Sequence, residues 1–185
     1  MADPNAIKMA VKTLREGGVI AYPTEAVYGF GCDPFSAPAV YHLLSIKHRQ
    51  PEKGVILVAS DWAQVDNLTK PIAPPLLAHV LETWPGPITW LFPASDLVPR
   101  WIRGNHDTIA LRVSDHPVVQ QLCSQFCGPI VSTSANTEGQ HPCRDYRTTC
   151  ITFKDKIDYI LNGHVGGLAR PTSIRDAITD EILRR

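Results

Sequence analysis

The chain has 185 residues, of which 44% are hydrophobic and 19% charged, and its formal net charge is zero. A globular chain of this length buries about two-thirds of its unfolded surface, so it can fold without disulfides or a structural metal. The neutral balance gives no overall attraction for nucleic acid. A site for an anionic ligand would therefore need a local cluster of basic side chains.

Three further features predict a cytoplasmic protein that is not inserted in a membrane. The longest apolar runs have the length of strands and fall short of the ~20 residues of a membrane-spanning helix. The first ten residues lack the basic and apolar segments of a signal peptide. The cysteines are odd in number and irregularly spaced, which is typical of reduced thiols; they are Cys32, Cys123, Cys127, Cys143 and Cys150.

Helix and strand patterns alternate in the first half of the chain. The first helix is predicted to begin at Pro4 behind an N-cap at Asp3 and to end at Gly17, with Ile7 and Leu14 on one apolar face. The next elements are a buried strand over 19–22 that stops at Pro23, a helix from Ser36 that ends at 47–49, and a buried strand over 55–58.

The second half continues this alternation. Its helices are predicted over 74–83, over 117–126 with Asp115 as N-cap, and within 145–156. Its strands are predicted over 88–92, 108–113 and 130–132, with short ones near 159–161, 173–177 and 181–184. A rigid turn at 84–87 and a polar loop at 133–144 separate some of these elements. Strands joined by both turns and helices predict an α/β domain with a mixed sheet flanked by helices.

Several common nucleotide and metal motifs are absent from the sequence. There is no P-loop, no G-x-S-x-G and no H-E-x-x-H, and Gly-Phe-Gly at 29–31 does not continue into a dinucleotide-binding motif. Cys123 and Cys127 are one helical turn apart, which is more typical of core thiols than of zinc ligands. We therefore predict no protein-bound metal and no prosthetic group.

A basic cluster, Lys47-His48-Arg49, stands where the second helix ends. On a continuing helix Lys47 and Arg49 would point apart. If the chain leaves the helix before Pro51, both side chains could reach one cleft and hold a polyphosphate. The alternative is a solvated helix C-terminus, where basic residues interact favourably with the helix dipole.

Two polar segments follow buried strands. Ser-Thr-Ser-Ala-Asn at 132–136 offers hydroxyls and an amide that could bind phosphate, ribose or carboxylate oxygens, although ordinary turn chemistry explains the same residues. The segment 23–29, Pro-Thr-Glu-Ala-Val-Tyr-Gly, is a second polar loop that could be purely structural.

Arg112 is the only charged residue in the apolar strand over 108–113. A buried arginine needs an anionic partner, which is either an internal Asp or Glu side chain or the carboxylate of a ligand. The residues themselves leave these two alternatives open.

In their order and spacing, these segments resemble the YrdC/TsaC family of threonylcarbamoyl-AMP synthases. The resemblance runs from about residue 7 to the end of the chain, and its motifs are PTEAVYG, KHR, KGVILV, WPGPIT, TIALRV, STSAN, SIRDA and the terminal EILRR. It implies a single YrdC-like domain over 1–185, similar to the short bacterial form, in which a twisted mixed sheet surrounds a concave basic cleft.

The resemblance also implies the reaction. Members of the family combine L-threonine, bicarbonate or CO2, and ATP to give threonylcarbamoyl-AMP and pyrophosphate, with Mg2+ carried mainly by the ATP. A threonylcarbamoyl transferase complex (TsaB, TsaD and TsaE) then modifies the adenosine next to the anticodon of tRNA. The expected partners are these substrates and this complex, together with possible direct binding of tRNA or double-stranded RNA.

The site residues are implied by their positions in the family's motifs. The signature tetrad, which we take as catalytic, corresponds to Lys47, Arg49, Ser134 and Asn136. The implied ATP-binding residues are Lys47, Arg49, Lys53, Thr108, Asn136, Arg144 and Arg184. The implied threonine-binding residues are Arg112, Ser134 and Thr172.

Two positions depart from the family pattern. Some relatives have threonine at the position of Ala26 and histidine at that of Val58, both in the threonine pocket, so the pocket here must be closed differently. One rival function is a non-catalytic RNA-binding ribosome-maturation factor that uses the same basic cleft, with salt-dependent RNA affinity and no ATP turnover. Another is a related carbamoyl-adenylate enzyme that acts on a different acceptor.

Overall fold

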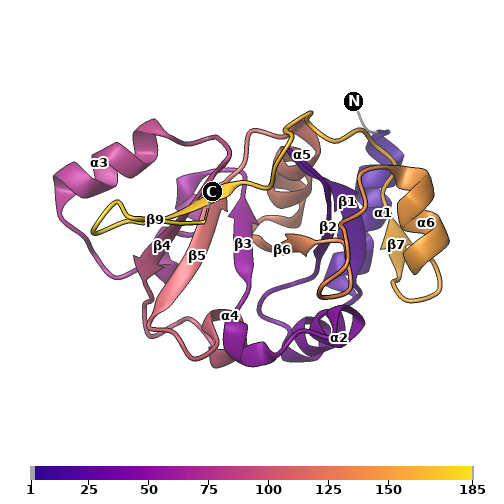
Figure 1. The fold of residues 1–185 in the computed structure, drawn as a ribbon, viewed down its shortest axis with the longest axis horizontal. Coiled ribbons are helices and arrows are strands. Elements are labelled where there is room, and N and C mark those ends of the chain that lie inside the picture. The colour runs from indigo at the N-terminus through magenta and orange to yellow at the C-terminus, as the bar shows by residue number, and fades with distance from the viewer. Residues whose placement is uncertain (1–2, 185) are drawn as a thin grey trace.

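The computed structural model describes residues 3–184, which form an α/β fold around one sheet (Figure 1). The nine strands of the sheet lie in the order β7-β1-β2-β6-β3-β5-β4-β8-β9. Their bounds are β1 Ile20–Pro23, β2 Tyr28–Gly31, β3 Ile56–Ala59, β4 Ile88–Pro93, β5 Thr108–Val113, β6 Ile130–Ser134, β7 Tyr159–Ile160, β8 Ser173–Asp176 and β9 Ile182–Arg184. Within this described part of the chain, no helix is both long and apolar enough to cross a membrane.

The sheet contains both parallel and antiparallel pairs. β1 pairs with β7, β3 with β5, and β4 with β8 in parallel, whereas the other neighbouring strands are antiparallel. The predicted fold class, an α/β mixed sheet flanked by helices, is therefore confirmed. The strand order places β6, β3 and β5 side by side although they are far apart in the sequence.

Helices flank the sheet and begin at recognisable signals. The α-helices are α1 Pro4–Arg15, α2 Ala37–Lys47, α3 Pro74–Glu82, α4 Arg100–Arg103, α5 Pro117–Phe126 and α6 Tyr146–Phe153, and short 3-10 helices occupy Pro51–Lys53, Trp62–Gln64 and Asp66–Leu68. The start of α1 is confirmed, because the Asp3 side chain accepts a hydrogen bond from the Asn5 backbone N–H at 3.0 Å.

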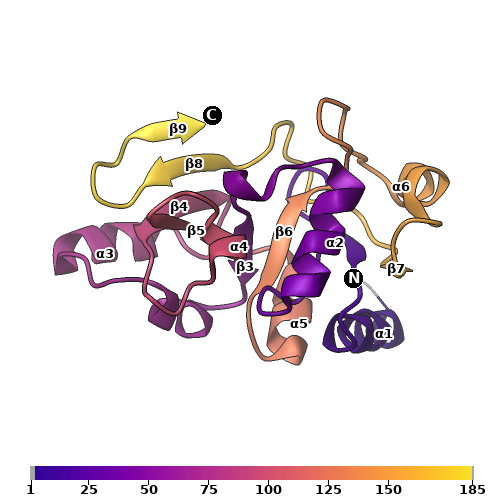
Figure 2. The ribbon, with the colours of Figure 1, turned by 90° about the horizontal axis from the view of Figure 1, so that it is seen from below.

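Two groups of buried side chains hold the helices against the sheet. On one face, α1 and α5 pack on the strands through residues such as Leu14, Val58 and Leu122. On the other face, α2, α3, α4 and α6 contribute to a larger core that includes Leu43 and Trp90. Figure 2 shows β8 and β9 on the opposite side of the molecule from α1 and α5.

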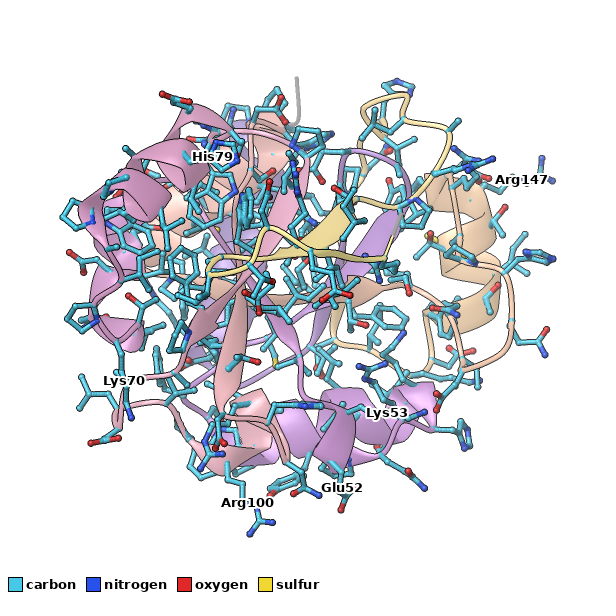
Figure 3. All side chains as sticks on the ribbon, turned by 60° about the vertical axis from the view of Figure 1, so that its left-hand side comes forward. Glu52, Lys53, Lys70, His79, Arg100 and Arg147 are labelled. Carbon is cyan, nitrogen blue, oxygen red and sulfur yellow. The ribbon has the colours of Figure 1, made fainter. Side chains whose placement is uncertain are left out.

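The face that carries α1 and α5 is covered only in part. Val58 of β3 and Ile130 of β6 are buried against α5, whereas Ile56 and Ser132, two residues away on the same face, line an open cavity. The cavity therefore lies where the helical cover of this face ends. Many other charged side chains, among them those of Lys70, Arg100 and Arg147, extend from the outer surface (Figure 3).

Some local predictions were wrong. The polar loop predicted over 23–29 is shorter, because Tyr28–Gly31 forms β2 and pairs with β1. Asp115 does not cap α5; the N-cap is His116, which is extended (φ −68°, ψ 124°) because it precedes Pro117. The four-residue helix α4 was not predicted, and β6 continues to Ser134.

Candidate functional site

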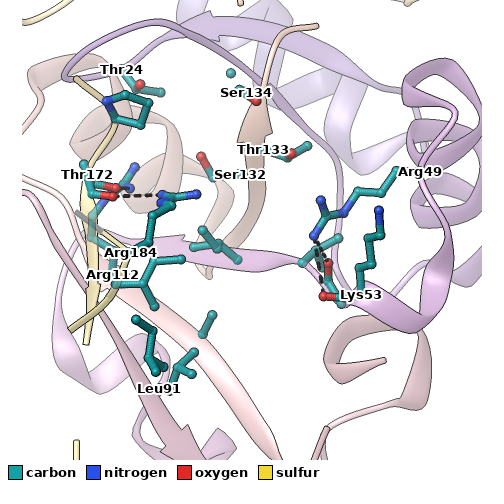
Figure 4. A pocket seen from close by; sticks show the side chains of 18 of the residues that line it. Thr24, Arg49, Lys53, Leu91, Arg112, Ser132, Thr133, Ser134, Thr172 and Arg184 are labelled. Atoms are coloured by element: carbon teal, nitrogen blue, oxygen red, sulfur yellow. Dashed lines mark hydrogen bonds between the residues drawn. The ribbon is translucent and has the colours of Figure 1, made fainter. Parts of the chain in front are cut away.

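A cavity of about 510 Å³ opens between the middle of the sheet and the C-terminal strands (Figure 4). This volume is within the range of small-molecule sites. Ile56, Ala110 and Ser132 line it from β3, β5 and β6, and Leu183 and Arg184 line it from β9. Because the lining comes from both ends of the sequence, the site exists only in the folded chain.

Basic side chains converge on this cavity. Among the described residues that line it there is no Asp or Glu, while the charged ones are Arg49, Lys53, Arg103, Arg112 and Arg184. Burial lowers the pKa of Arg184, and the charges of Arg112 and Arg49 lower it further. Three arginines thus lie close enough to repel one another, an arrangement that an anionic ligand would relieve.

Lys47, the last residue of α2, is bonded to the last residue of β6 and to the loop after it. Its Nζ donates to the carbonyl oxygen of Ser134, to that of Asn136 at 2.9 Å, and to Asn136 Oδ1 at 3.1 Å. These three bonds use every hydrogen of the ammonium group. Ser134 Oγ also donates to Asn136 Oδ1, at 2.6 Å. The three residues therefore form one bonded unit, of which Ser134 lines the cavity.

The environment of Lys47 lowers its pKa. Only 3% of Lys47 is exposed, and burial is the main cause that lowers its pKa to about 8. Repulsion from Arg49 acts in the same direction, and attraction to Glu138 opposes it.

Arg49 and Lys53 line the end of the cavity next to α2. His48 is in the left-handed conformation (φ 53°, ψ 36°), so the chain leaves the helix as predicted and Arg49 enters the lining. Arg49 Nη2 donates to the Gly54 carbonyl oxygen at 3.0 Å. Lys53 forms an ion pair with Glu138 of the loop after β6, and both side chains are nearly half exposed.

Arg112 lines the opposite end of the cavity (Figure 4). Its Nη1 donates to Thr172 Oγ1 at 2.8 Å, and its Nη2 lies 3.2 Å from Glu25 Oε2. Ser114 Oγ donates to the other carboxylate oxygen of Glu25 at 2.6 Å. Arg184 Nη2 donates to the Thr172 carbonyl oxygen at 2.8 Å. The internal-carboxylate alternative for Arg112 is thus confirmed, although the arginine also faces the cavity.

Most of the predicted site residues share this cavity. Those that line it are Arg49, Lys53, Thr108, Arg112, Ser134, Thr172 and Arg184. Lys47 and Asn136 are not in the lining but are bonded to Ser134. Arg144 is also outside the lining; it donates to the carbonyl oxygens of Leu168 at 2.8 Å and Ala169 at 3.4 Å, and so holds the segment before Thr172.

Other residues of the site were not predicted from the sequence. Glu25 and Ser114 support Arg112, and their only signal was the position of Glu25 in a segment that proved fully buried. Arg103 and His106 line the cavity from α4 and the loop after it, which gave no signal. Ser132 belongs to the polar segment 132–136 that was considered for ligand binding, but it was given no role of its own; it shares a face of β6 with Ser134, because alternate residues of a strand point the same way.

The two departures from the family pattern have different positions. Ala26 lines the cavity, where its methyl group leaves space that a larger side chain would fill. Val58 is fully buried in the core beside α5 and does not line the cavity.

Comparison with known proteins identifies close relatives. A threonylcarbamoyl-AMP synthase of Coxiella burnetii (strain RSA 493 / Nine Mile phase I) is 59% identical over 179 residues, which cover 97% of this chain and 96% of the relative. The protein of the same name from Xanthomonas axonopodis pv. citri (strain 306) is 48% identical over 190 residues, with full coverage of both chains.

Solved structures share the fold. P. abyssi Sua5 complexed with L-threonine matches with a TM-score of 0.86 at 30% identity, over 92% of this chain and 50% of the Sua5 chain, so this chain spans half the length of that protein. E. coli YciO matches with a TM-score of 0.87 at 24% identity, over 99% of this chain and 90% of its own, and shows the likeness of fold alone. The Sua5/YciO/YrdC family model, described as "Telomere recombination", matches residues 12–185. The chain therefore belongs to the Sua5/YciO/YrdC family.

Proposed function

We propose that this protein is a threonylcarbamoyl-AMP synthase, which converts L-threonine, bicarbonate or CO2, and ATP into threonylcarbamoyl-AMP and pyrophosphate. The observation that carries the proposal is one cavity with Arg112 and Thr172 at one end and Arg49 and Lys53 at the other. Such a cavity suits an amino acid beside a polyphosphate. The relatives that bear this name at 48–59% identity support the same conclusion.

The amino-acid end would be organised by Arg112. A guanidinium matches the planar geometry of a carboxylate, so Arg112 would bind the carboxylate of threonine. Thr172 would line the same pocket, and its Oγ1 accepts a hydrogen bond from Arg112. The L-threonine complex of P. abyssi Sua5 supports an amino-acid site in this fold.

The polyphosphate end would be organised by Arg49 and Lys53, and Arg184 would contact the nucleotide from the side of Thr172, to whose carbonyl oxygen it donates. Their charges would neutralise the phosphates, and Thr108 could add a hydroxyl contact. Arginine and lysine are not metal ligands, so Mg2+ would arrive as part of the ATP complex. Arg144 would act on the ATP site indirectly, because it holds Leu168 in the segment that leads to Thr172.

Two chemical steps follow from this arrangement. The neutral amine of threonine adds CO2 to give a carbamate and a proton. A carbamate oxygen then attacks the α-phosphorus of ATP, the P–O bond to the β-phosphate breaks, and pyrophosphate leaves in line. Negative charge increases at that phosphorus, so positioned cations and hydrogen-bond donors stabilise the transition state.

Ser134 and Asn136 would act on the reacting groups. Ser134 lines the cavity, and it would orient the carbamate and the α-phosphate. Lys47 would fix the end of β6 and the loop after it, because its three hydrogens are bonded to Ser134 and Asn136. In this proposal Lys47 does not contact the phosphates, and its positive charge would stabilise them electrostatically from its position next to Ser134.

The direct test is a pyrophosphate-release assay with each substrate omitted in turn. Release should depend on both threonine and bicarbonate, and mass spectrometry with isotopically labelled threonine should detect threonylcarbamoyl-AMP. Release that does not respond to threonine would contradict the proposal. Serine and other amino acids in place of threonine would identify an enzyme that uses a different acceptor.

The partners of the product belong to the same proposal. Threonylcarbamoyl-AMP would be passed to a threonylcarbamoyl transferase complex (TsaB, TsaD and TsaE) for tRNA modification, and residues 1–185 would act as one YrdC-like domain. The rival function, an RNA-binding ribosome-maturation factor, is not favoured, because the relatives are named as synthases. Direct binding of tRNA or double-stranded RNA stays a prediction, which an RNA-binding titration at several salt concentrations would test.

A further inference from the structure

Ser132 lies on the floor of the cavity between its two charged ends. In Figure 4 its side chain is between the group of Arg112 and Thr172 and the group of Ser134 and Arg49. It lines the cavity although it is only 7% exposed, so a ligand that reached it would be well shielded from water. None of the roles proposed above uses this hydroxyl.

The Ser132 hydroxyl can act as a hydrogen-bond acceptor for a ligand. Tyr22, which is fully buried, donates its one hydrogen to the carbonyl oxygen of the adjacent Val131 at 3.3 Å, so it has no hydrogen left to donate to Ser132. The two lone pairs of Ser132 Oγ can therefore accept a hydrogen bond from a ligand.

An apolar side chain stands next to this acceptor. Ile56 is the direct cross-strand partner of Ser132 in the antiparallel pair of β3 and β6, so the two side chains are neighbours on one face. Ile56 also lines the cavity and is itself paired with Ala110 of β5, which lines it too. The floor therefore presents a hydrogen-bond acceptor beside an aliphatic surface.

We propose that Ser132 and Ile56 determine the side-chain specificity of the site, with Ser132 accepting a hydrogen bond from the hydroxyl of threonine and Ile56 packing against its methyl group. The inference rests on the proposed function, and it names residues that read the substrate side chain. Threonine carries one hydroxyl and one methyl on the same carbon, which matches the acceptor and the aliphatic surface.

The experiment compares substrates that lack one group each. L-2-Aminobutyrate lacks the hydroxyl of threonine and serine lacks its methyl. Ser132→Ala should lower kcat/KM for threonine by about tenfold and leave kcat/KM for 2-aminobutyrate within about twofold. Ile56→Ala should lower kcat/KM for threonine and leave serine within about twofold. If either side chain had only a structural role, its removal would lower kcat/KM for all substrates by a similar factor.

Two comparison variants make the result specific. Ser124 is an exposed serine on α5, and Ser124→Ala should change kcat/KM for neither substrate. Ser134→Ala should lower kcat/KM for threonine and for 2-aminobutyrate by the same factor, because the contacts proposed for Ser134 are common to both substrates. Thermal unfolding and the KM for ATP check that Ser132→Ala retains its fold and its nucleotide site.

The outcomes separate this inference from the proposed function. Without threonine-dependent pyrophosphate release in the unmodified protein, the proposed function itself fails. If the unmodified protein is active and Ser132→Ala loses threonine and 2-aminobutyrate activity equally, then Ser132 serves the amine or the carbamate, and the specificity role is overturned. Unchanged threonine activity in Ser132→Ala would overturn it as well.

Discussion

Arg112 and Glu25 form a buried ion pair, with Nη2 and Oε2 3.2 Å apart and about 5% of each side chain exposed. Ser114 holds the second oxygen of Glu25, and Thr172 accepts a hydrogen bond from Arg112. The guanidinium is therefore fixed from two sides before any ligand binds. Glu25 also supplies the counter-charge without which a buried arginine would be strongly unfavourable.

Removal of this counter-charge should destabilise the fold. Glu25→Gln keeps the shape of the side chain but leaves Arg112 buried and unpaired, so the free energy of unfolding should fall by about 3 kcal/mol. The double variant Glu25→Gln/Arg112→Met leaves no unpaired charge, so its free energy of unfolding should fall by less than that of Glu25→Gln alone. Urea denaturation of the three proteins measures both differences. A double variant less stable than the single one would show that the pair is not the cause.

The pKa of Lys47, lowered to about 8, predicts a loss of activity at alkaline pH. When Lys47 gives up a proton, it can no longer donate to all three acceptors on Ser134 and Asn136, and the loop that carries them loosens. The kcat measured with saturating substrates should therefore fall as the pH rises through about 8. Lys47→Arg stays charged over this range, so the alkaline decrease should disappear. The same decrease in Lys47→Arg would assign it to another group.

Stability should change in the opposite direction over the same range. The folded-state pKa of Lys47 is about 8 and its ordinary value is 10.5, so between these values the unfolded chain binds more protons. The contribution of Lys47 to the free energy of unfolding therefore increases with pH in this window. Urea denaturation at several pH values should show this increase in the unmodified protein and a smaller one in Lys47→Arg.

Glu138 is expected to compete with ATP for the same cations. Its pKa is lowered mainly by a hydrogen bond from Lys53, with smaller effects from the charges of Lys53, Arg49 and Lys47. In the proposed function the phosphates of ATP must replace this carboxylate at Lys53. Glu138→Gln should therefore lower the KM for ATP by about two- to fivefold, a modest effect because the pair is exposed and screened.

A neighbouring carboxylate provides the matched control. Glu52 is exposed, makes no ion pair within residues 3–184, and extends away from Lys53 on the surface (Figure 3). Glu52→Gln removes the same charge and should leave the KM for ATP almost unchanged. Equal effects of the two substitutions would indicate a general change of surface charge. The effect of Glu138→Gln should also vanish in a Lys53→Ala background.

Local sequence signals predicted much of the fold. The Asp3-Pro4 start of α1 follows from N-cap chemistry, and the strands β3, β4 and β5 follow from apolar runs. β2 could not be predicted, because Gly29 and Gly31 weaken a strand pattern. A Cβ at Gly31 would lie 2.7 Å from the Tyr22 ring and 2.8 Å from the Val131 carbonyl oxygen, so close packing between strands requires glycine there.

The contacts between site residues could not be predicted from local sequence patterns. The sequence indicated that Arg112 needs an anion, but Glu25 becomes its partner only when a loop after β1 meets β5. The sequence left open whether Lys47 and Arg49 both reach one cleft or lie at a solvated helix end. In the structure the left-handed His48 directs Arg49 into the cavity, while Lys47 bonds to the backbone behind Ser134. Such differences depend on tertiary packing.

Substitution of the two basic residues at the end of α2 tests their separate roles. Lys47→Ala and Arg49→Ala should each reduce threonine-dependent pyrophosphate release by at least about tenfold, a loss of over ~1.4 kcal/mol of transition-state stabilisation. Arg49 lines the cavity, so its loss should also raise the KM for ATP. Lys47 acts through Ser134 and Asn136, so its loss should appear mainly in kcat. Unchanged turnover in both variants would remove the roles assigned to them, and a raised KM for ATP with unchanged kcat in Lys47→Ala would instead make Lys47 a direct phosphate ligand.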